Sequence, residues 1–127
     1  MKRVLFVCVE NSNRSQMAQA FAQMMGGEQI EALSAGSKPS GRINPKAIRF
    51  MAELGYDLTS HQSKSLDQVS GDFDAVITMG CGDNCPWIPA RIRQDWALPD
   101  PRDMDDDGYR AVRDEIGERV RALLEAL

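Results

Sequence analysis

Residues 2–9 form an apolar run of valine, leucine and phenylalanine that leads directly into a polar loop and then into a helical pattern. A short continuous apolar run of this kind is typical of a parallel strand that is buried on both faces. The loop that follows opens at Cys8 and closes at Arg14 and Ser15. A buried strand that passes through a tight loop into a helix restricts the chain to an α/β fold.

Three more segments have the composition of strands, and they alternate with three helical patterns. The strands are predicted at residues 30–35, 73–79 and 93–98, and the helices at residues 14–25, 45–54 and 109–127. Asn44 caps the second helix, and Pro45 takes its first position. Inward-facing stripes are expected at Met17, Ala18, Phe21, Met24 and Met25 in the first helix and at Val112, Ile116, Val120, Leu123 and Leu124 in the last.

Strands that alternate with helices imply a parallel sheet with right-handed crossovers. We therefore predict a single-domain, three-layer α/β sandwich with a central four-stranded parallel sheet. The length of 127 residues suits one domain, with residues 1–127 as a single catalytic unit. In this architecture the Cys8 loop lies at the carboxyl edge of a central strand, where open α/β sheets bind their ligands.

The composition argues against several classes of function. The formal net charge of −4 makes nucleic acid an unsuitable partner. No stretch resembles a signal peptide or reaches membrane-spanning length, so we expect a cytoplasmic protein with no membrane partner. Three cysteines, an odd number, indicate catalytic or redox thiols in such a chain rather than a disulfide framework.

The spacing of Cys8, Arg14 and Ser15 is that of an anion site with a nucleophile at its bottom. The intervening backbone N–H groups can surround one oxyanion, and the guanidinium adds further donors. The substrate-binding residues are therefore predicted to be Val9, Glu10, Asn11, Ser12, Asn13, Arg14 and Ser15. The same field, at the start of a helix, favours thiolate over thiol at Cys8. The alternative is a buried structural cysteine and a surface arginine.

Individual side chains of this loop carry more specific expectations. Asn11 is expected to hold the shape of the loop, and Ser15 to donate its hydroxyl to the Cys8 thiolate, although both could be ordinary turn or cap residues. A carboxylate beside an oxyanion would oppose binding, so Glu10 is expected to point to solvent. His61 is expected to make local capping bonds, because a thiolate nucleophile needs no base.

Two further groups of residues could complete the chemistry. Cys81 and Cys85 lie four positions apart in a glycine-bearing loop, where one thiol can attack a disulfide and the next can resolve it. The alternatives are two inert thiols or half of a zinc site, for which only His61 and Cys8 are left as soft partners. Asp100, between two prolines, could protonate a leaving oxygen or could be an ordinary turn residue.

Residues 103–108 match the opening of a calcium loop, with Asp114 at its closing position. A closing glutamate would be expected there, and the prolines on either side of Asp100 forbid the entering helix. We therefore predict a solvated run of acids at the start of the last helix. No metal ligand is assigned in the chain.

The run from Cys8 to Ala18 resembles the catalytic loop of the low-molecular-weight tyrosine phosphatase superfamily, in its thioredoxin-coupled arsenate reductase branch. The resemblance covers nearly the whole chain. Further matches are Ser34-Ala35-Gly36, Ser60-His61-Gln62-Ser63-Lys64, Met79-Gly80-Cys81-Gly82-Asp83-Asn84-Cys85-Pro86 and Asp95-Trp96-x-Leu98-Pro99-Asp100-Pro101. Cys-x5-Arg-Ser alone specifies only the superfamily. Gln16, where such phosphatases usually carry proline, and the two later cysteines favour the reductase.

The resemblance implies reduction of arsenate to arsenite, with phosphate or sulfate as competing anions. Cys8 would attack arsenate held by the loop and Arg14, while Asp100 protonates the departing hydroxyl. Cys81 would then attack Cys8 and supply two electrons, and Cys85 would attack Cys81. The final Cys81–Cys85 disulfide would be reduced by thioredoxin, so no bound cofactor is needed.

Two departures from the family pattern bear on cofactors and partners. Only three residues separate Cys81 from Cys85, and this short gap resembles relatives that use a low-molecular-weight thiol such as mycothiol with a glutaredoxin-like protein. Members with a structural potassium ion carry acids where this chain has Gln19 and Lys64, so no potassium is predicted. The alternative functions are a phosphatase for phosphotyrosine or small phosphomonoesters, and a non-catalytic redox or metal-binding module built on the two later cysteines.

Overall fold

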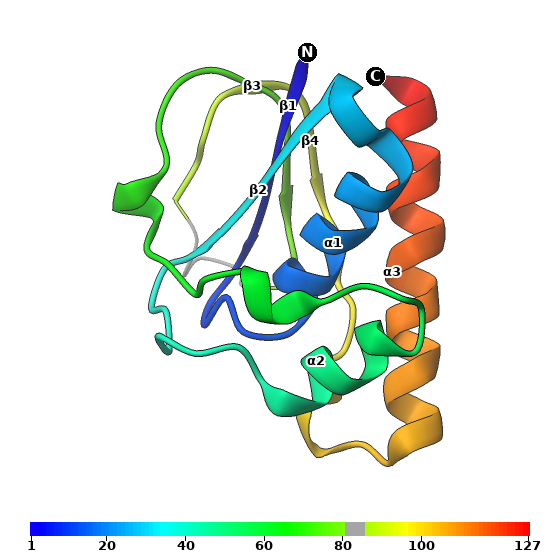
Figure 1. Cartoon of the computed structure of the whole chain (residues 1–127). Helices are drawn as coiled ribbons and strands as arrows, with labels where there is room; N and C mark the ends of the chain where they lie inside the picture. The colour runs from blue at the N-terminus through cyan, green and yellow to red at the C-terminus, as the bar shows by residue number, and fades with distance from the viewer. Residues whose placement is uncertain (81–85) are drawn as a thin grey trace.

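The centre of the computed structural model, which describes residues 1–80 and 86–127, is a parallel sheet. Its four strands lie in the order β2-β1-β3-β4. They are β1 (Lys2–Cys8), β2 (Ile30–Gly36), β3 (Phe73–Thr78) and β4 (Ala90–Asp95). All pairings are parallel, so the carboxyl ends of the strands meet at one edge of the sheet, the lower edge in Figure 1. The predicted α/β class and four-stranded parallel sheet are confirmed.

Three α-helices lie on one side of this sheet (Figure 1). They are α1 (Arg14–Gly26), α2 (Pro45–Ala52) and α3 (Asp106–Ala126). Helix α1 packs against β1, β2 and α3, and α2 touches both of the other helices. The large side chains of the core on this side are fully buried, among them Phe6, Met17, Phe50, Ile77, Tyr109 and Ile116.

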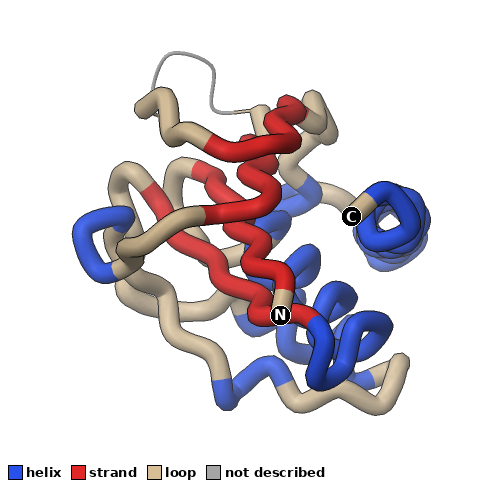
Figure 2. The backbone as a smooth tube through the Cα atoms, turned by 90° about the horizontal axis from the view of Figure 1, so that it is seen from above, coloured by secondary structure: helices blue, strands red, loops and turns tan. Residues whose placement is uncertain are grey.

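The opposite face of the sheet carries a thinner layer, made of loops and one short 3₁₀ helix, Leu66–Gln68 (Figure 2). Leu5, Val7 and Val76 point to this face and are buried beneath Leu66 and Val69. The sandwich therefore has its three layers, but all three α-helices cover one face. The described helices include none that is long and apolar enough to cross a membrane.

The edge strand β4 lies three residues earlier than the predicted strand at 93–98. Its residues are mostly exposed and half of them are charged, because only one of its sides pairs with a neighbour. It therefore lacks the apolar run that marks a central strand. The apolar residues that suggested the strand, Trp96 and Leu98, instead follow it and enter the core. The Trp96 ring lies 6.0 Å from that of Phe6, between centroids.

The helices differ from their predicted bounds mainly at their ends. Met24 and Met25 are 44% and 45% exposed, because burial in α1 stops at Ala22 and the last turn extends beyond the packed part. Helix α2 ends at Ala52, two residues early, and its predicted cap by the Asn44 side chain is confirmed. Helix α3 begins at Asp106 because the side chain of Asp105 caps it by accepting from the Gly108 N–H at 2.8 Å.

Candidate active site

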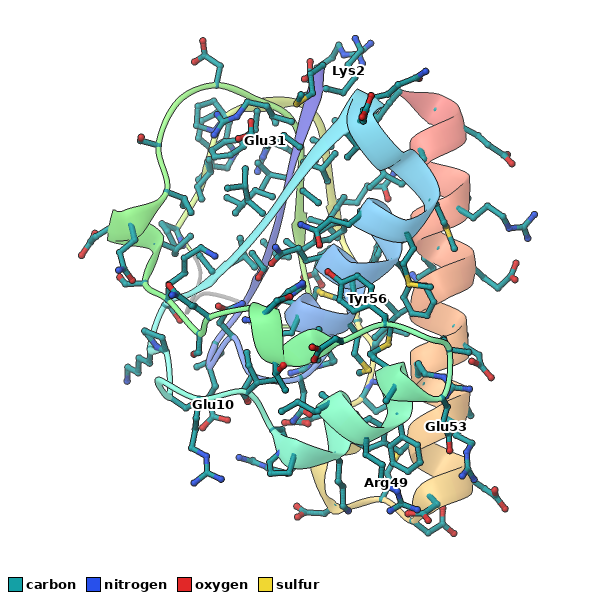
Figure 3. The ribbon with its side chains drawn as sticks, in the orientation of Figure 1. Lys2, Glu10, Glu31, Arg49, Glu53 and Tyr56 are labelled. Carbon is teal, nitrogen blue, oxygen red and sulfur yellow. The ribbon has the colours of Figure 1, made fainter. Side chains whose placement is uncertain are left out.

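The loop from Cys8 to Arg14 joins β1 to α1 at the carboxyl edge of the sheet. Strand β1 lies between β2 and β3, so the loop is at the centre of that edge, where Figure 3 labels Glu10. Beside the loop lies a cavity of about 240 Å³. It is lined by Cys8, Val9, Glu10, Ser12, Asn13, Arg14, Asp100 and Arg102.

The carbonyl groups of the loop all find partners on the protein. The connection after β2 donates its N–H groups to three of them, and α1 binds the other two. The bonds run from Lys38 to Val9 (2.8 Å), from Ser40 to Glu10 (3.0 Å), from Asn44 to Ser12 (3.1 Å), from the Gln16 side chain to Asn11 (3.0 Å) and from Met17 to Asn13 (3.0 Å). With its acceptors bound elsewhere, the loop has its N–H donors to offer an anion.

The sulfur of Cys8 lies 2.8 Å from the hydroxyl of Ser15, and the cysteine is only 4% exposed. The same hydroxyl oxygen accepts a hydrogen bond from the Asn11 side-chain amide at 2.8 Å. Because that oxygen is already an acceptor, its own proton is free to be donated to sulfur. Ser15 therefore contacts the nucleophile, as predicted, and Asn11 acts on the nucleophile only through Ser15.

Asn11 adopts a left-handed backbone conformation, with φ of 51°. The strain is offset by its fully buried side chain, whose oxygen accepts from the Lys64 N–H at 2.9 Å and from the Gln16 amide at 2.9 Å. Gly36 at the end of β2 lets the loop approach, since a Cβ there would lie 2.5 Å from the Val9 carbonyl oxygen.

Gln16 extends these bonds to His61, which the sequence did not predict. The Gln16 amide nitrogen also donates to the Gln62 carbonyl at 2.9 Å, so its oxygen must face His61 and accept from the Nδ1–H, 2.9 Å away. Burial, with a smaller contribution from the charge of Lys64, lowers the pKa of His61 to about 4, so the ring is neutral near pH 7. His61 also makes the expected local capping bond, because its backbone N–H donates to the Leu58 carbonyl at 3.1 Å at the end of the 3₁₀ helix Leu58–Ser60. The contact of its ring with Gln16 is an additional, long-range one. We refer to Asn11, Ser15 and Gln16 as the buried support.

Arg14 and Asp100 reach the cavity from different elements. The Arg14 guanidinium Nη1 donates to the Leu98 carbonyl at 2.6 Å, which fixes the arginine at the start of α1. Asp100 precedes the 3₁₀ helix Pro101–Asp103 and caps it by accepting from the Arg102 N–H at 3.0 Å. The structure therefore brings Cys8, Arg14 and Asp100 to one cavity, as predicted.

Glu10 does not simply point to solvent. Its carboxylate is 45% exposed but lines the cavity and lies 3.3 Å from the guanidinium of Arg102, a residue that sequence reasoning did not select. Arg102 also lies 3.9 Å from the Asp100 carboxylate. These three charged side chains are far more exposed than Cys8, and we call Glu10, Asp100 and Arg102 the mouth of the cavity.

Tyr109 in α3 makes a second buried contact with the site, and the sequence did not predict it as a site residue. Its hydroxyl donates to the side-chain oxygen of Asn13 in the loop, and both residues are buried. Burial is the main cause that raises the pKa of Tyr109, and the negative charge of Asp100 adds to it. In the sequence Tyr109 is only the first residue of the predicted last helix, and nothing there signals this contact with a residue 96 positions away.

The predicted relay cysteines, Cys81 and Cys85, lie outside the described residues. The described chain before them ends at Gly80, whose φ is 77° and whose N–H donates to the Asp95 carboxylate at 3.2 Å. A Cβ on Gly80 would lie 3.1 Å from Arg14 Nη1, so this backbone passes close to the guanidinium.

The acidic residues at 103–108 act as local structure in this fold. Asp105 caps α3, and Asp106 lies 3.0 Å from Arg49 of α2. Within residues 1–80 and 86–127, no group of three His, Cys, Asp or Glu side chains is arranged to hold a metal ion.

Comparison with known proteins identifies the family of this site. A glutaredoxin arsenate reductase from Synechocystis sp. is 41% identical over 128 residues, which cover 98% of this chain and 97% of the relative. A solved structure of an arsenate reductase in the phosphate binding state superposes with a TM-score of 0.91 and 39% identity, covering 99% of this chain and 98% of the other.

A third relative broadens the comparison. A thioredoxin-dependent arsenate reductase from Corynebacterium glutamicum is 35% identical with a TM-score of 0.81, and the match covers 99% of this chain and 61% of that one. The model of the low molecular weight phosphotyrosine protein phosphatases matches residues 3–127, which include the whole Cys8 loop and Asp100. The chain belongs to the low molecular weight phosphotyrosine protein phosphatase family.

Proposed function

We propose that residues 1–127 form a single catalytic domain that reduces arsenate to arsenite. The observation that carries the proposal is the cavity that Cys8, Arg14 and Asp100 line together. The identity of the substrate is inferred from the similar proteins that are named arsenate reductases. Phosphate and sulfate, which have the same tetrahedral shape, are expected to compete for the cavity.

The first step joins arsenate to Cys8. The N–H groups of the loop and the Arg14 guanidinium hold the oxyanion, and the Cys8 thiolate attacks arsenic. A sulfur–arsenic bond forms and an arsenic–oxygen bond breaks, and Asp100 donates the proton that lets the oxygen depart as water. Ser15, by donating a hydrogen bond to sulfur, favours the thiolate before the attack.

The second step transfers the electrons. Cys81 attacks the Cys8 sulfur, a disulfide forms, and the sulfur–arsenic bond breaks with its electron pair left on arsenic, which becomes arsenite. Cys85 then attacks Cys81 and returns Cys8 to the thiolate. The approach of the Gly80 backbone to Arg14 supports this order, because Gly80 immediately precedes Cys81.

The cycle requires an external dithiol, for which we propose a protein of the thioredoxin or glutaredoxin class. The relatives support this class, since one is named for glutaredoxin and another is thioredoxin-dependent. The protein itself needs no bound cofactor, because the electrons pass through its thiols. Thiols in relay need a reducing compartment, which supports the expected cytoplasmic location.

Steady-state reduction of arsenate by the wild type and by Cys8→Ser, Cys81→Ser and Cys85→Ser tests the proposal. Each is assayed with reduced thioredoxin, with glutaredoxin and glutathione, and with mycothiol. The wild type is expected to turn over with at least one donor, and Cys8→Ser with none. Full turnover of Cys81→Ser and Cys85→Ser with thioredoxin contradicts the relay, and activity of Cys85→Ser only with a small thiol indicates the shorter, mycothiol-like route.

A phosphatase is the second candidate, because the matching family model describes phosphotyrosine protein phosphatases. In that function the cavity binds a phosphate ester, Cys8 takes the phosphoryl group and water releases it. Hydrolysis of p-nitrophenyl phosphate by the same variants separates the two functions. Full hydrolysis by Cys81→Ser and Cys85→Ser, with no arsenate reduction by the wild type in any donor system, would establish the phosphatase.

A further inference from the structure

The mouth of the cavity is bridged by an ion pair between distant parts of the chain. Glu10 belongs to the Cys8 loop, and Arg102 belongs to the 3₁₀ helix Pro101–Asp103, 92 residues later. Their side chains meet with Arg102 Nη1 3.3 Å from Glu10 Oε2, and Arg102 Nη2 lies 3.9 Å from Asp100 Oδ2. Both partners line the same cavity as Cys8.

The backbone is fixed at both ends of this bridge. The Glu10 carbonyl accepts from the Ser40 N–H and from the Ser63 hydroxyl, each at 3.0 Å. The Arg102 carbonyl accepts from the Lys46 ammonium at 3.3 Å, and its N–H donates to Asp100. Only the two side chains are therefore free to change partners.

The side chains themselves are held weakly. The Arg102 side chain is 52% exposed and that of Glu10 is 45% exposed, so water screens the pair and can replace either partner. A guanidinium is planar, and its fork of donors matches two oxygens of a tetrahedral oxyanion as well as it matches a carboxylate. An anion that enters the cavity carries more charge than the Glu10 carboxylate and can displace it.

The negative charges at the mouth favour this displacement of Glu10 from Arg102 by an anion. Glu10 and Asp100 are both negative and both line the cavity, and the whole chain has a net charge of −4. Neither the mouth without Arg102 nor the protein as a whole attracts an oxyanion. Arg14 inside the cavity already shares one of its nitrogens with the Leu98 carbonyl. Arg102 is thus the cation available at the entrance.

We propose that Arg102 is a second substrate-binding arginine, which leaves Glu10 for the incoming oxyanion and closes the mouth over it. Glu10 competes for the same guanidinium and thereby sets the affinity of the free protein. Closure by Arg102 occupies the space through which the organic group of an ester would leave, so the cavity prefers small inorganic oxyanions. The inference rests on the proposed function, since it specifies the anion that the Cys8 cavity accepts.

Calorimetric binding of inorganic phosphate tests the exchange without any need for reduction. Arg102→Ala should raise the dissociation constant about fivefold or more, and Glu10→Gln should lower it about threefold. Arg102→Lys keeps the charge but loses the fork, so its affinity should lie between those of the wild type and Arg102→Ala. Arg119→Ala is the matched control, because Arg119 forms a similar exposed pair with Glu115, at 3.4 Å, on α3.

The outcomes separate this inference from the proposed function. If Arg102→Ala binds phosphate as tightly as the wild type and Arg119→Ala do, the inference is wrong, even when arsenate reduction is intact. If no donor supports arsenate reduction but the phosphate affinities follow the expected order, the inference holds and the proposed function fails. With active protein, Arg102→Ala should raise KM for arsenate about fivefold while kcat changes less than about twofold.

The preference for inorganic anions has its own measurement. Phenylphosphonate, which is not hydrolysed, carries an organic group at the point where Arg102 would close. Arg102→Ala should weaken the binding of phosphate at least about threefold more than the binding of phenylphosphonate. Equal losses for the two ligands would leave Arg102 as a general attractor of anions and overturn its role in selecting small ones.

Discussion

The buried support beneath Cys8 and the mouth of the cavity are built from opposite kinds of interaction. Asn11, Ser15 and Gln16 are each 0% exposed, and they are joined by neutral hydrogen bonds of 2.8 to 3.0 Å. At the mouth, charged side chains that are 35% to 52% exposed meet at 3.3 and 3.9 Å. The support therefore holds its bonds whether or not a ligand is present, whereas the mouth holds bonds that a ligand can replace.

The energies of the two regions differ for the same reason. Leaving a buried polar group without its partner costs about 1–3 kcal/mol, whereas an exposed ion pair contributes about 0–1 kcal/mol. Substitutions in the support should therefore lower stability and activity together. Substitutions at the mouth should change binding or turnover and leave stability nearly unchanged.

Asn11→Ala is expected to have the largest effect. It leaves the Lys64 N–H and the Ser15 hydroxyl without their buried partner and places alanine at a φ of 51°. The free energy of unfolding in urea should fall by about 2–4 kcal/mol, and arsenate turnover should fall with it. Asn11→Gly is the control, because glycine accepts the left-handed backbone and should be about 1 kcal/mol less destabilised. Equal and small losses in both variants would mean that the support does not hold the loop.

Tyr109→Phe tests the neutral hydrogen bond from Tyr109 of α3 to Asn13 of the Cys8 loop. The substitution keeps the ring in the core, stacked on Phe50 at 4.9 Å between centroids, and removes only the hydroxyl that donates to Asn13. We expect a loss of about 1–2 kcal/mol in the free energy of unfolding, measured in urea. A variant as stable as the wild type would show that the buried Asn13 oxygen finds another donor.

His61 should make the support sensitive to acid. Its pKa is about 4 in the folded protein and about 6.5 when free, so between these values the unfolded chain binds more protons. Stability therefore falls as the pH is lowered from about 6.5 to 4 and is fully present above that window. The His61→Gln variant cannot titrate, so its free energy of unfolding should fall by about 1 kcal/mol less than that of the wild type over this range. The difference is small because the His61 ring is partly exposed and water screens it. Urea unfolding of both proteins at pH 7, 5.5 and 4.5 gives the comparison, and identical pH profiles would contradict it.

Asp100→Asn should have the smallest effect on stability. An asparagine oxygen can still cap the 3₁₀ helix Pro101–Asp103 by accepting from the Arg102 N–H, so the free energy of unfolding should change by less than about 0.5 kcal/mol. The amide cannot donate an acidic proton, so kcat for arsenate should fall by about 100-fold. A large loss of stability in this variant would remove the distinction between support and mouth.

The parts of the fold that could be predicted from sequence are those whose signal is local. The apolar runs of β1 and β3 mark strands buried on both faces, and Asn44-Pro45 marks the start of α2. Strand β4 was misplaced because an edge strand has no such run. Its position depends on pairing with β3, which no segment of the sequence encodes by itself.

In the site, too, contacts between residues close in sequence could be predicted and contacts between distant residues could not. Cys8, Asn11, Arg14 and Ser15 lie within eight residues, so their spacing alone predicted that they share one loop. The contacts between Gln16 and His61, and between Glu10 and Arg102, join residues 45 and 92 positions apart. These pairs meet only through the packing of β2, the loops after α2 and the segment before α3, which periodicity and spacing do not describe.

The bonds between the Cys8 loop and the connection after β2 also set an order of assembly. Residues 38–44 supply N–H donors to the loop carbonyls, and Ser63 and Lys64 bind Glu10 and Asn11. During synthesis, β1 and Cys8 emerge first. The Cys8 loop cannot make all of its hydrogen bonds until the chain up to residue 64 has been made and has docked on it. Affinity for an oxyanion therefore requires residues 38–64 to be docked on the Cys8 loop, and binding of an oxyanion reports a chain that is native around its first fourteen residues.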